Sequence, residues 1–274
     1  RFHNDGPPGA EIGMVRTNTD LSSANSTSGM EHFNIGGWKD FTNCTNSVCS
    51  YPVSGSALYQ FNDNSHDTCG NYNGAGGSNI TYVPSGNFGK AANFPGNLST
   101  AGDAIELPSS LSTLLSNDYS ISIWFNADDF ATGCVSGCGN YPTLITCFDN
   151  LQFVYCVHNP SGDYVLAFYD YNTSAYLYGS TTLSTGTWYH TVLTKSSTDG
   201  VKIYLDGVLE ASNSGMTANT PTGNTGKNLI GMYKSTSANP YDLPWNGLMD
   251  QIRIYNSVLT PAQVTQVYNE IYCP

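Results

Sequence analysis

Residues 119–125 read Tyr119-Ser-Ile-Ser-Ile-Trp-Phe125, and this stretch decides the fold class. Its odd-numbered residues are large and apolar, whereas its even-numbered residues are Ser, Ser and Trp. This alternation predicts a β-strand with one face against a core. Similar short runs, separated by turn residues, predict an antiparallel β-sandwich. They lie at Ala57–Phe61, Leu144–Phe148, Phe153–His158, Tyr164–Tyr169, Ala175–Tyr178, Thr187–Thr194, Val201–Leu205, Asn228–Met232 and Leu248–Tyr255.

Two local signals sharpen this prediction. Asp206-Gly207 separates two strand-like runs, and a two-residue type I′ turn needs positive φ at both central positions, so the pair predicts a β-hairpin. Thr260-Pro261-Ala262-Gln263 places a hydroxyl at the N-cap, proline at the first helical position and Gln at N3. The sequence therefore predicts one short helix that ends before Cys273.

The composition indicates the class of protein. Of the 274 residues only 11% are charged, and the net charge is −12 with nine scattered Lys and Arg. Without a basic stripe, binding to nucleic acid or to an anionic membrane surface is disfavoured. No run of 18 apolar residues is present, so the sequence predicts no membrane span.

Eight cysteines, an even number, favour disulfides and an oxidising compartment. Zinc is the alternative, but only Cys134 and Cys138 have remotely suitable spacing. Eight cysteines allow 105 pairings, and sequential proximity favours one of them. The predicted disulfides are Cys44–Cys49, Cys134–Cys138, Cys147–Cys156 and Cys69–Cys273.

Five N-x-S/T sequons fall in polar stretches and are candidate glycosylation sites, although a chain rich in Asn, Ser and Thr forms several by chance. They are Asn25, Asn43, Asn79, Asn97 and Asn172.

The first 53 residues differ from the rest in composition. They hold few apolar residues and several Pro, Gly, Ser and Asn clusters, so we expect residues 1–53 to form an irregular arm and residues 54–274 the sandwich. Such an arm is seldom ordered alone, and we expect it to pack either on its own sandwich or on a neighbouring chain.

Residues from about 55 to 271 resemble the laminin G-like, concanavalin A-like jelly-roll domains. The resemblance is carried by Ala57-Leu-Tyr-Gln-Phe-Asn62, Asp67-Thr-Cys-Gly-Asn71, Phe88-Gly-Lys-Ala-Ala-Asn-Phe94, Tyr119–Phe125, Gly186-Thr-Trp-Tyr-His190, Val201-Lys-Ile-Tyr-Leu-Asp-Gly207 and Trp245-Asn-Gly-Leu-Met-Asp-Gln-Ile-Arg-Ile-Tyr-Asn256. In order, these motifs are similar to the opening strand and turn, the two central strands with their hairpin, and the closing strand. The resemblance implies the fold and leaves the function open.

The resemblance also implies a calcium ion between the opening turn and the last strand. The matching positions are Asp67, Asn71 and Asp250, which offer the oxygen ligands that calcium prefers. The alternative is that Asp67 and Asn71 cap the turn while Asp250 pairs with Arg253. Cys69 stands where the family has Ser, which fits a bond to Cys273.

Catalysis is disfavoured. Glucanases of this fold use two carboxylates on one strand, whereas the nearest acids here, Asp103 and Glu106, would point to opposite faces of a strand. No Gly-x-Ser-x-Gly elbow is present. His190 matches a position that is structural in the family, so we expect a packed core histidine. We therefore predict no catalytic residues.

Glycan binding needs exposed aromatic rings beside hydrogen-bonding groups. The candidate residues are Tyr171, Tyr178, Tyr241, Trp245 and Asp242, although tyrosines also serve as cross-strand pairs. We expect a non-catalytic binding or adhesion module at the cell or virion surface, with a glycan or another cell-surface ligand as its partner. The rival is a structural subunit of a filament, coat or virion that contacts its neighbours through the arm. A glycoside hydrolase is the least favoured alternative.

Overall fold

The computed structural model describes residues 15–17, 30–34, 37–40 and 48–270, except residues 56, 98–100, 116–117, 132–140, 150–152, 159–161, 218–224, 235 and 237–240. Residues 1–47 belong to one compact unit and Val48–Glu270 form the other.

The first unit contains a small antiparallel sheet with strand order β1-β2-β3. Its strands are β1 (Val15–Thr17), β2 (Met30–Asn34) and β3 (Gly37–Asp40). The sequence predicts no regular element here, because these residues lack a sustained apolar period. The domain boundary near residue 53 and the partner of the arm stay predictions.

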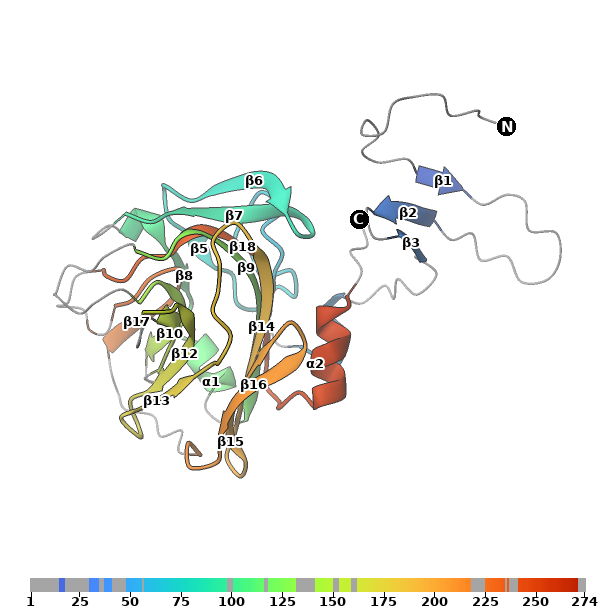
Figure 1. Cartoon of the computed structure of the whole chain (residues 1–274). Helices are drawn as coiled ribbons and strands as arrows, with labels where there is room; N and C mark the ends of the chain where they lie inside the picture. The colour runs from blue at the N-terminus through green and yellow to red at the C-terminus, as the bar shows by residue number, and fades with distance from the viewer. Residues whose placement is uncertain are drawn as a thin grey trace. The chain divides into compact units, whose positions relative to one another are not determined.

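The second unit is the β-sandwich that the sequence predicts, built from two antiparallel sheets (Figure 1). The seven-stranded sheet has the order β13-β12-β11-β10-β17-β8-β5. Its strands are β13 (Ala175–Tyr178), β12 (Val165–Asp170), β11 (Phe153–His158), β10 (Thr143–Asp149), β17 (Thr225–Ile230), β8 (Ile105–Leu107) and β5 (Ala75–Gly76).

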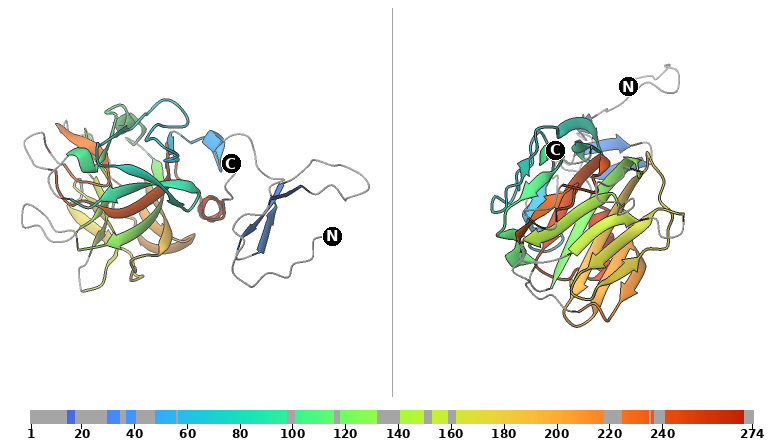
Figure 2. Two further views of the ribbon diagram at one scale, coloured as in Figure 1. Left: turned by 90° about the horizontal axis from the view of Figure 1, so that it is seen from above. Right: turned by 90° about the vertical axis from the view of Figure 1, so that its left-hand side faces the viewer.

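The eight-stranded sheet has the order β16-β15-β14-β9-β18-β7-β6, with β4 paired to β18 beside this path. Its strands are β16 (Val208–Asn213), β15 (Gly200–Leu205), β14 (Trp188–Ser196), β9 (Tyr119–Asp129), β18 (Asn246–Tyr255), β7 (Gly89–Pro95), β6 (Thr81–Gly86) and β4 (Ala57–Tyr59). Figure 2 shows the two sheets stacked face to face.

Strand β9 is buried on both of its faces. Its odd-numbered residues from Tyr119 to Phe125 lie in the main core between the sheets, as their alternation predicts. Its other face is also buried, although the sequence predicts a mostly polar surface there. Ser122 Oγ lies 2.8 Å from His190 Nε2, and the Trp124 ring stacks on Tyr268. This second face is covered because helix α2 lies over it.

The predicted hairpin and helix are both confirmed. Asp206 and Gly207 have φ values of 49° and 82°, and they join β15 to β16. Helix α2 (Pro261–Tyr268) begins with the complete capping box of Thr260 and Gln263. It packs on the outer face of the eight-stranded sheet (Figure 1), in a cluster formed by Val192, Tyr204, Tyr255, Leu259, Val264 and Val267. Within the described ranges no helix is long and apolar enough to cross a membrane.

Several short elements are not predicted from the sequence. They include the hairpin of β6 and β7, strand β8, and the one-turn helix α1 (Leu111–Leu114). Strand β6 is largely exposed and contains Pro84, so it has no apolar alternation to detect. The 3-10 turns η1 (Val48–Ser50) and η2 (Ala101–Asp103) complete the unit.

Candidate functional site

The outer face of the seven-stranded sheet carries a continuous cluster of rings, which we call the aromatic face. Residues of β11, β12 and β13 alternate between two environments, so Phe168 and Leu177 enter the core while their neighbours point outwards. Cys156 and Ala167 form the buried floor of the face. The rings above and around this floor belong to Tyr141, His158, Tyr169, Tyr171, Tyr176, Tyr178 and Tyr233.

Strand pairing sets the positions of these rings. Tyr169 on β12 lies opposite Tyr176 on β13, and Ala167 lies opposite Tyr178. The Tyr176 and Tyr178 rings stack nearly parallel with 5.2 Å between their centroids, and they remain 40% and 36% exposed. Because the Ala167 side chain is small, it does not cover the rings of the edge strand β13. Both rings therefore face the solvent.

Tyr171 extends the face beyond the sheet. Its hydroxyl lies 3.0 Å from the hydroxyl of Tyr233, which follows β17 in the chain. Its ring meets Tyr169 edge to face at 4.5 Å. The turn that carries it is fixed by Asp170, whose Oδ1 accepts hydrogen bonds from the backbone N and Nδ2 of Asn172.

His158 lies among these rings and is 7% exposed. Its ring stacks on Tyr141 at 4.2 Å between centroids, and it lies 5.4 Å from Tyr176 and 5.1 Å from Tyr178. Burial lowers the pKa of His158, so the ring is neutral at neutral pH. Its buried Nδ1 has no hydrogen-bond partner among the described residues.

Three tyrosines and the thiol of the face also favour their uncharged forms. Burial raises the pKa of Tyr171, Tyr176 and Tyr178 above the ordinary value, and it raises that of the Cys156 thiol to about 12. The charge of nearby Asp170 is neutralised within the protein, because Lys195 Nζ donates to its Oδ2 at 2.6 Å and both side chains are buried.

Glu210 on β16 holds the end of the edge strand β13. Its carboxylate accepts four hydrogen bonds of 2.9–3.0 Å from the backbone N and hydroxyl groups of Ser180 and Thr181. Burial alone would raise the pKa of Glu210, but these hydrogen bonds outweigh burial and lower it. The clamp joins the edges of the two sheets two residues after Tyr178.

The structure separates the five predicted glycan-binding residues. Tyr171 and Tyr178 belong to the aromatic face. Tyr241 is half-buried elsewhere, with Lys234 Nζ 4.3 Å from its ring centroid. Trp245 and Asp242 are the wrong choices, because both are buried. The Trp245 ring packs edge to face on Phe125 in the core, and Asp242 Oδ1 accepts from the backbone N of Leu243.

The five predicted residues leave out Tyr169, Tyr176 and Tyr233 of the aromatic face, and also Tyr141 and His158. The sequence contains a signal for the position of His158. It lies two residues after Cys156, so both side chains are on the outward face of β11. The signal cannot be used before it is known which face of the strand meets the core. Tyr141 precedes β10 and follows no period.

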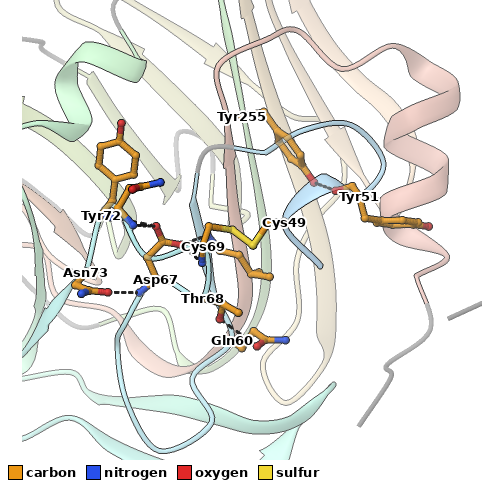
Figure 3. Close-up of a disulfide and its surroundings, with 11 residues drawn as sticks. Cys49, Tyr51, Gln60, Asp67, Thr68, Cys69, Tyr72, Asn73 and Tyr255 are labelled. Atoms are coloured by element: carbon orange, nitrogen blue, oxygen red, sulfur yellow. Dashed lines mark hydrogen bonds between the residues drawn. A yellow bond between two sulfur atoms is a disulfide. The ribbon is translucent and has the colours of Figure 1, made fainter. Parts of the chain in front are cut away.

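The carboxylate of Asp67 organises the opening turn through backbone hydrogen bonds (Figure 3). Its Oδ1 accepts from the backbone N of Leu58 and Cys69 at 2.8 and 2.9 Å, and its Oδ2 accepts from Asn71 and Tyr72 at 3.1 and 3.0 Å. Both carboxylate oxygens already face N–H hydrogens, so Asp67 fits the capping alternative better than the role of a calcium ligand.

Of the other predicted calcium ligands, Asn71 lies in the same turn as Asp67, whereas Asp250 lies on strand β18. Asp250 is buried and its Oδ2 accepts from the backbone N of Phe88 at 2.8 Å. Its Oδ1 has no hydrogen-bond partner within the described part, and burial raises its pKa to about 7. The alternative pairing of Asp250 with Arg253 is wrong, because Arg253 pairs with Glu270. Within the described ranges no group of three or more His, Cys, Asp or Glu could hold a metal. The calcium ion stays a prediction.

Three of the predicted disulfides are wrong. Cys49 bonds to Cys69, so neither Cys44–Cys49 nor Cys69–Cys273 forms (Figure 3). This bond joins η1 to the turn of Asp67. Its two cysteines are 20 residues apart in the sequence, so pairing cysteines by their proximity in the sequence does not predict it. In addition, the hydroxyl of Tyr255 on β18 donates to the backbone O of Tyr51 at 2.9 Å. Residues 48–53 therefore pack with the sandwich.

Cys147 and Cys156 do not bond to each other, although β10 and β11 pair as predicted. The register explains this result. Cys147 lies opposite Phe153 and points into the core, whereas Cys156 lies opposite Thr143 and forms the floor of the aromatic face. Cys156 lies three residues along β11 from the residue opposite Cys147, and an odd offset along a strand sends side chains to opposite faces.

Other predicted sites are settled in part. The Cys134–Cys138 bond and the sequons Asn25 and Asn43 lie outside the described residues. Asn79 and Asn97 are exposed, and Asn172 is half-buried, but glycosylation stays a prediction. His190 is confirmed as a core histidine with no exposed surface.

The candidate acid pair has structural partners. Asp103 Oδ1 accepts from Asn79 Nδ2 at 2.8 Å, and Glu106 pairs with Lys227.

Comparisons with known proteins identify the fold. No curated protein matches the chain. Domain 4 of AbnA, a GH43 extracellular arabinanase from Geobacillus stearothermophilus solved in complex with arabinotriose, is 26% identical, with a TM-score of 0.57 over 78% of this chain and 97% of that domain. The binding domain of botulinum neurotoxin serotype D is 20% identical, with a TM-score of 0.53 over 78% of this chain and 51% of that one.

The neurotoxin domain, at this identity, shares the fold alone. The family model for the concanavalin A-like lectin/glucanases superfamily matches residues 99–265, which is more than half of the chain. These residues include every strand of the aromatic face, the core strand β9 and most of helix α2. The chain therefore belongs to the concanavalin A-like lectin/glucanases superfamily.

Proposed function

We propose that this chain is a non-catalytic carbohydrate-binding module that binds glycans on its aromatic face. The observation that carries the proposal is the exposure of the Tyr176 and Tyr178 rings above a floor of buried strands. Exposed large apolar groups are informative when they gather on a rigid surface. Rings with polar hydroxyl groups suit sugars, because one part of the ring contacts C–H groups while the hydroxyl forms hydrogen bonds.

The arabinanase domain supports the proposal. It is similar to this chain over nearly its whole length, and it was solved with a bound arabinose oligomer. Arabinotriose is therefore the first ligand to test. The absence of a catalytic function is part of the proposal, and it is supported by the structural partners of Asp103 and Glu106.

We also propose an extracellular or surface location. The Cys49–Cys69 disulfide supports it, because such bonds persist in oxidising compartments. The partner would then be a glycan or another ligand on a surface outside the cell. A calcium ion near Asp250 would be a structural addition to this function.

The proposal is tested by a glycan array, followed by calorimetric titration of arabinotriose and the best array ligand. We expect the double variant Tyr176→Ala/Tyr178→Ala to bind at least about tenfold more weakly, because exposed aromatic anchors dominate binding energy. The matched control is Val208→Ala/Leu209→Ala, which removes exposed apolar side chains, 66% and 50% exposed, from the other sheet. Equal losses in the two double variants would contradict the proposal.

A further inference from the structure

The aromatic face is free of charge, which restricts what it can bind. Its rings are six tyrosines and one neutral histidine. Asp170, at the end of β12, is buried and pairs with the buried Lys195. The whole chain carries a net charge of −12. An anionic ligand would lose its hydration on this face, would find no cation among the described residues of the face, and would be repelled by the chain.

His158 Nδ1 is the second observation. A buried polar atom without a hydrogen-bond partner is uncommon in a folded protein and calls for an explanation. Among the described residues, the rings of Tyr141, Tyr176 and Tyr178 contact the ring of His158, and none of them forms a hydrogen bond with its Nδ1. The chain therefore keeps an unmet hydrogen-bonding group at the floor of an exposed aromatic cluster.

The cover over this atom is uneven. The rings of Tyr176 and Tyr178 contact His158 and are the exposed members of the cluster, while Tyr141 is half-buried. Exposed side chains change rotamer within picoseconds to nanoseconds. Of the two exposed rings, that of Tyr178 lies nearer to the ring of His158, at 5.1 Å between centroids, and it can rotate without any change in the backbone of β11 or β13.

We infer that the aromatic face takes neutral saccharides, and that the Nδ1 of His158 forms a hydrogen bond with a sugar hydroxyl when the Tyr178 ring moves aside. The inference rests on the proposed function. It adds the class of ligand and the residue that forms a hydrogen bond with it. A hydroxyl both donates and accepts, so it pairs with Nδ1 in either neutral tautomer of the imidazole. A carboxylate or sulfate group could pair only with a ring nitrogen that carries a proton.

The ligand class is tested with matched neutral and acidic probes. The neutral probes are oligomers of arabinose and galactose, together with lactose, and the acidic probes are oligogalacturonate and sialyllactose. We expect binding of neutral probes only, with affinity that changes less than about twofold between 50 and 500 mM NaCl, because no charge pair is screened. A preference for acidic probes overturns the inference and leaves the proposed function standing. Binding of no glycan at all overturns both.

The role of His158 is tested by His158→Phe, which keeps an aromatic ring for stacking on Tyr141 and removes both nitrogens. We expect about tenfold weaker binding of the best neutral probe. His158→Gln keeps a polar group, and we expect it to recover part of the loss. The matched control is His66→Phe, the same substitution in an exposed loop between β4 and β5. Unchanged affinity in His158→Phe overturns this part of the inference.

A measurement on the unaltered chain covers the case in which a variant does not fold. With 15N-labelled histidine, the Nδ1 resonance of His158 reports the hydrogen bonding of that atom directly. We expect the resonance to shift as the best neutral probe is added, with no shift for His190, whose ring is fully buried under α2. A titration that saturates without moving the His158 resonance overturns the assignment.

Discussion

Two buried polar residues of the sandwich carry consequences that can be measured. His190 has no exposed surface, and its Nε2 lies 2.8 Å from Ser122 Oγ while its ring contacts Trp124. Burial, with a smaller contribution from the charge of Arg253, lowers the pKa of His190 to about 3. The carboxylate of buried Asp67 instead accepts hydrogen bonds from four backbone N–H groups.

The pKa of His190 predicts a loss of stability in acid. Below about pH 6.5 the unfolded chain binds a proton that the folded chain refuses until about pH 3, so unfolding becomes easier as the pH falls through this window. The free energy of unfolding should fall by up to about 1.4 kcal/mol per pH unit from this group. His190→Gln should flatten the dependence in urea unfolding curves at pH 7, 5 and 4. An unchanged slope would show that other groups set it.

The hydrogen bonds of Asp67 in the opening turn should contribute to the free energy of unfolding. Asp67→Ala leaves four N–H groups without their acceptor, and we expect a loss of about 3 kcal/mol in the free energy of unfolding. The measurement is urea unfolding of both chains, each with and without EDTA. A wild-type midpoint that falls in EDTA would support the calcium ion, and a midpoint that does not move would leave Asp67 as a cap alone.

At the scale of elements, the edge strand β13 depends on the opposite sheet. Glu210 on β16 binds Ser180 and Thr181, directly after the strand that presents Tyr176 and Tyr178. Edge strands have a neighbour on one side only, so a clamp at the end of β13 limits the positions that its rings sample. The two sheets are thus joined where the proposed ligand binds.

The clamp predicts an effect on binding at a distance from the rings. Glu210→Ala should weaken glycan binding by about threefold to tenfold, because the rings are then less well preorganised. Titration calorimetry measures the effect, and Glu106→Ala is the control, since it removes a surface ion pair with Lys227 on another strand. Equal affinities for the two variants would mean that β13 holds its position without Glu210.

At the scale of the whole molecule, the sequence predicts the sandwich because its strands keep a two-residue period and its turns keep their special residues. The Asp206-Gly207 hairpin and the Thr260 cap are local signals and are confirmed. Disulfide pairing and the candidate site depend on register and on which sheet face is covered. No local pattern in the sequence indicates that Cys69 bonds to Cys49 or that Trp245 lies in the core.

Helix α2 explains why the two outer faces differ. It covers the outer face of the eight-stranded sheet, and the outward side of β9, with Ser122 and Trp124, becomes a second small core. No described helix lies in the cluster of the aromatic face. This difference supports placing the proposed binding surface on the seven-stranded sheet.

The opposite placement of Cys147 and Cys156 gives the chain two built-in chemical reporters. Cys156 lies directly under the aromatic rings, whereas Cys147 lies in the main core. A thiol-reactive dye can reach Cys156 when the rings part, but it should reach Cys147 only when the sandwich opens. We expect mass spectrometry to find Cys156 modified before Cys147, and a bound glycan to slow that modification while leaving the rate at Cys147 unchanged. Equal protection of both thiols would point to general stabilisation of the fold. The two thiols that do not form a disulfide would thus report separately on the parting of the aromatic rings and on the opening of the sandwich.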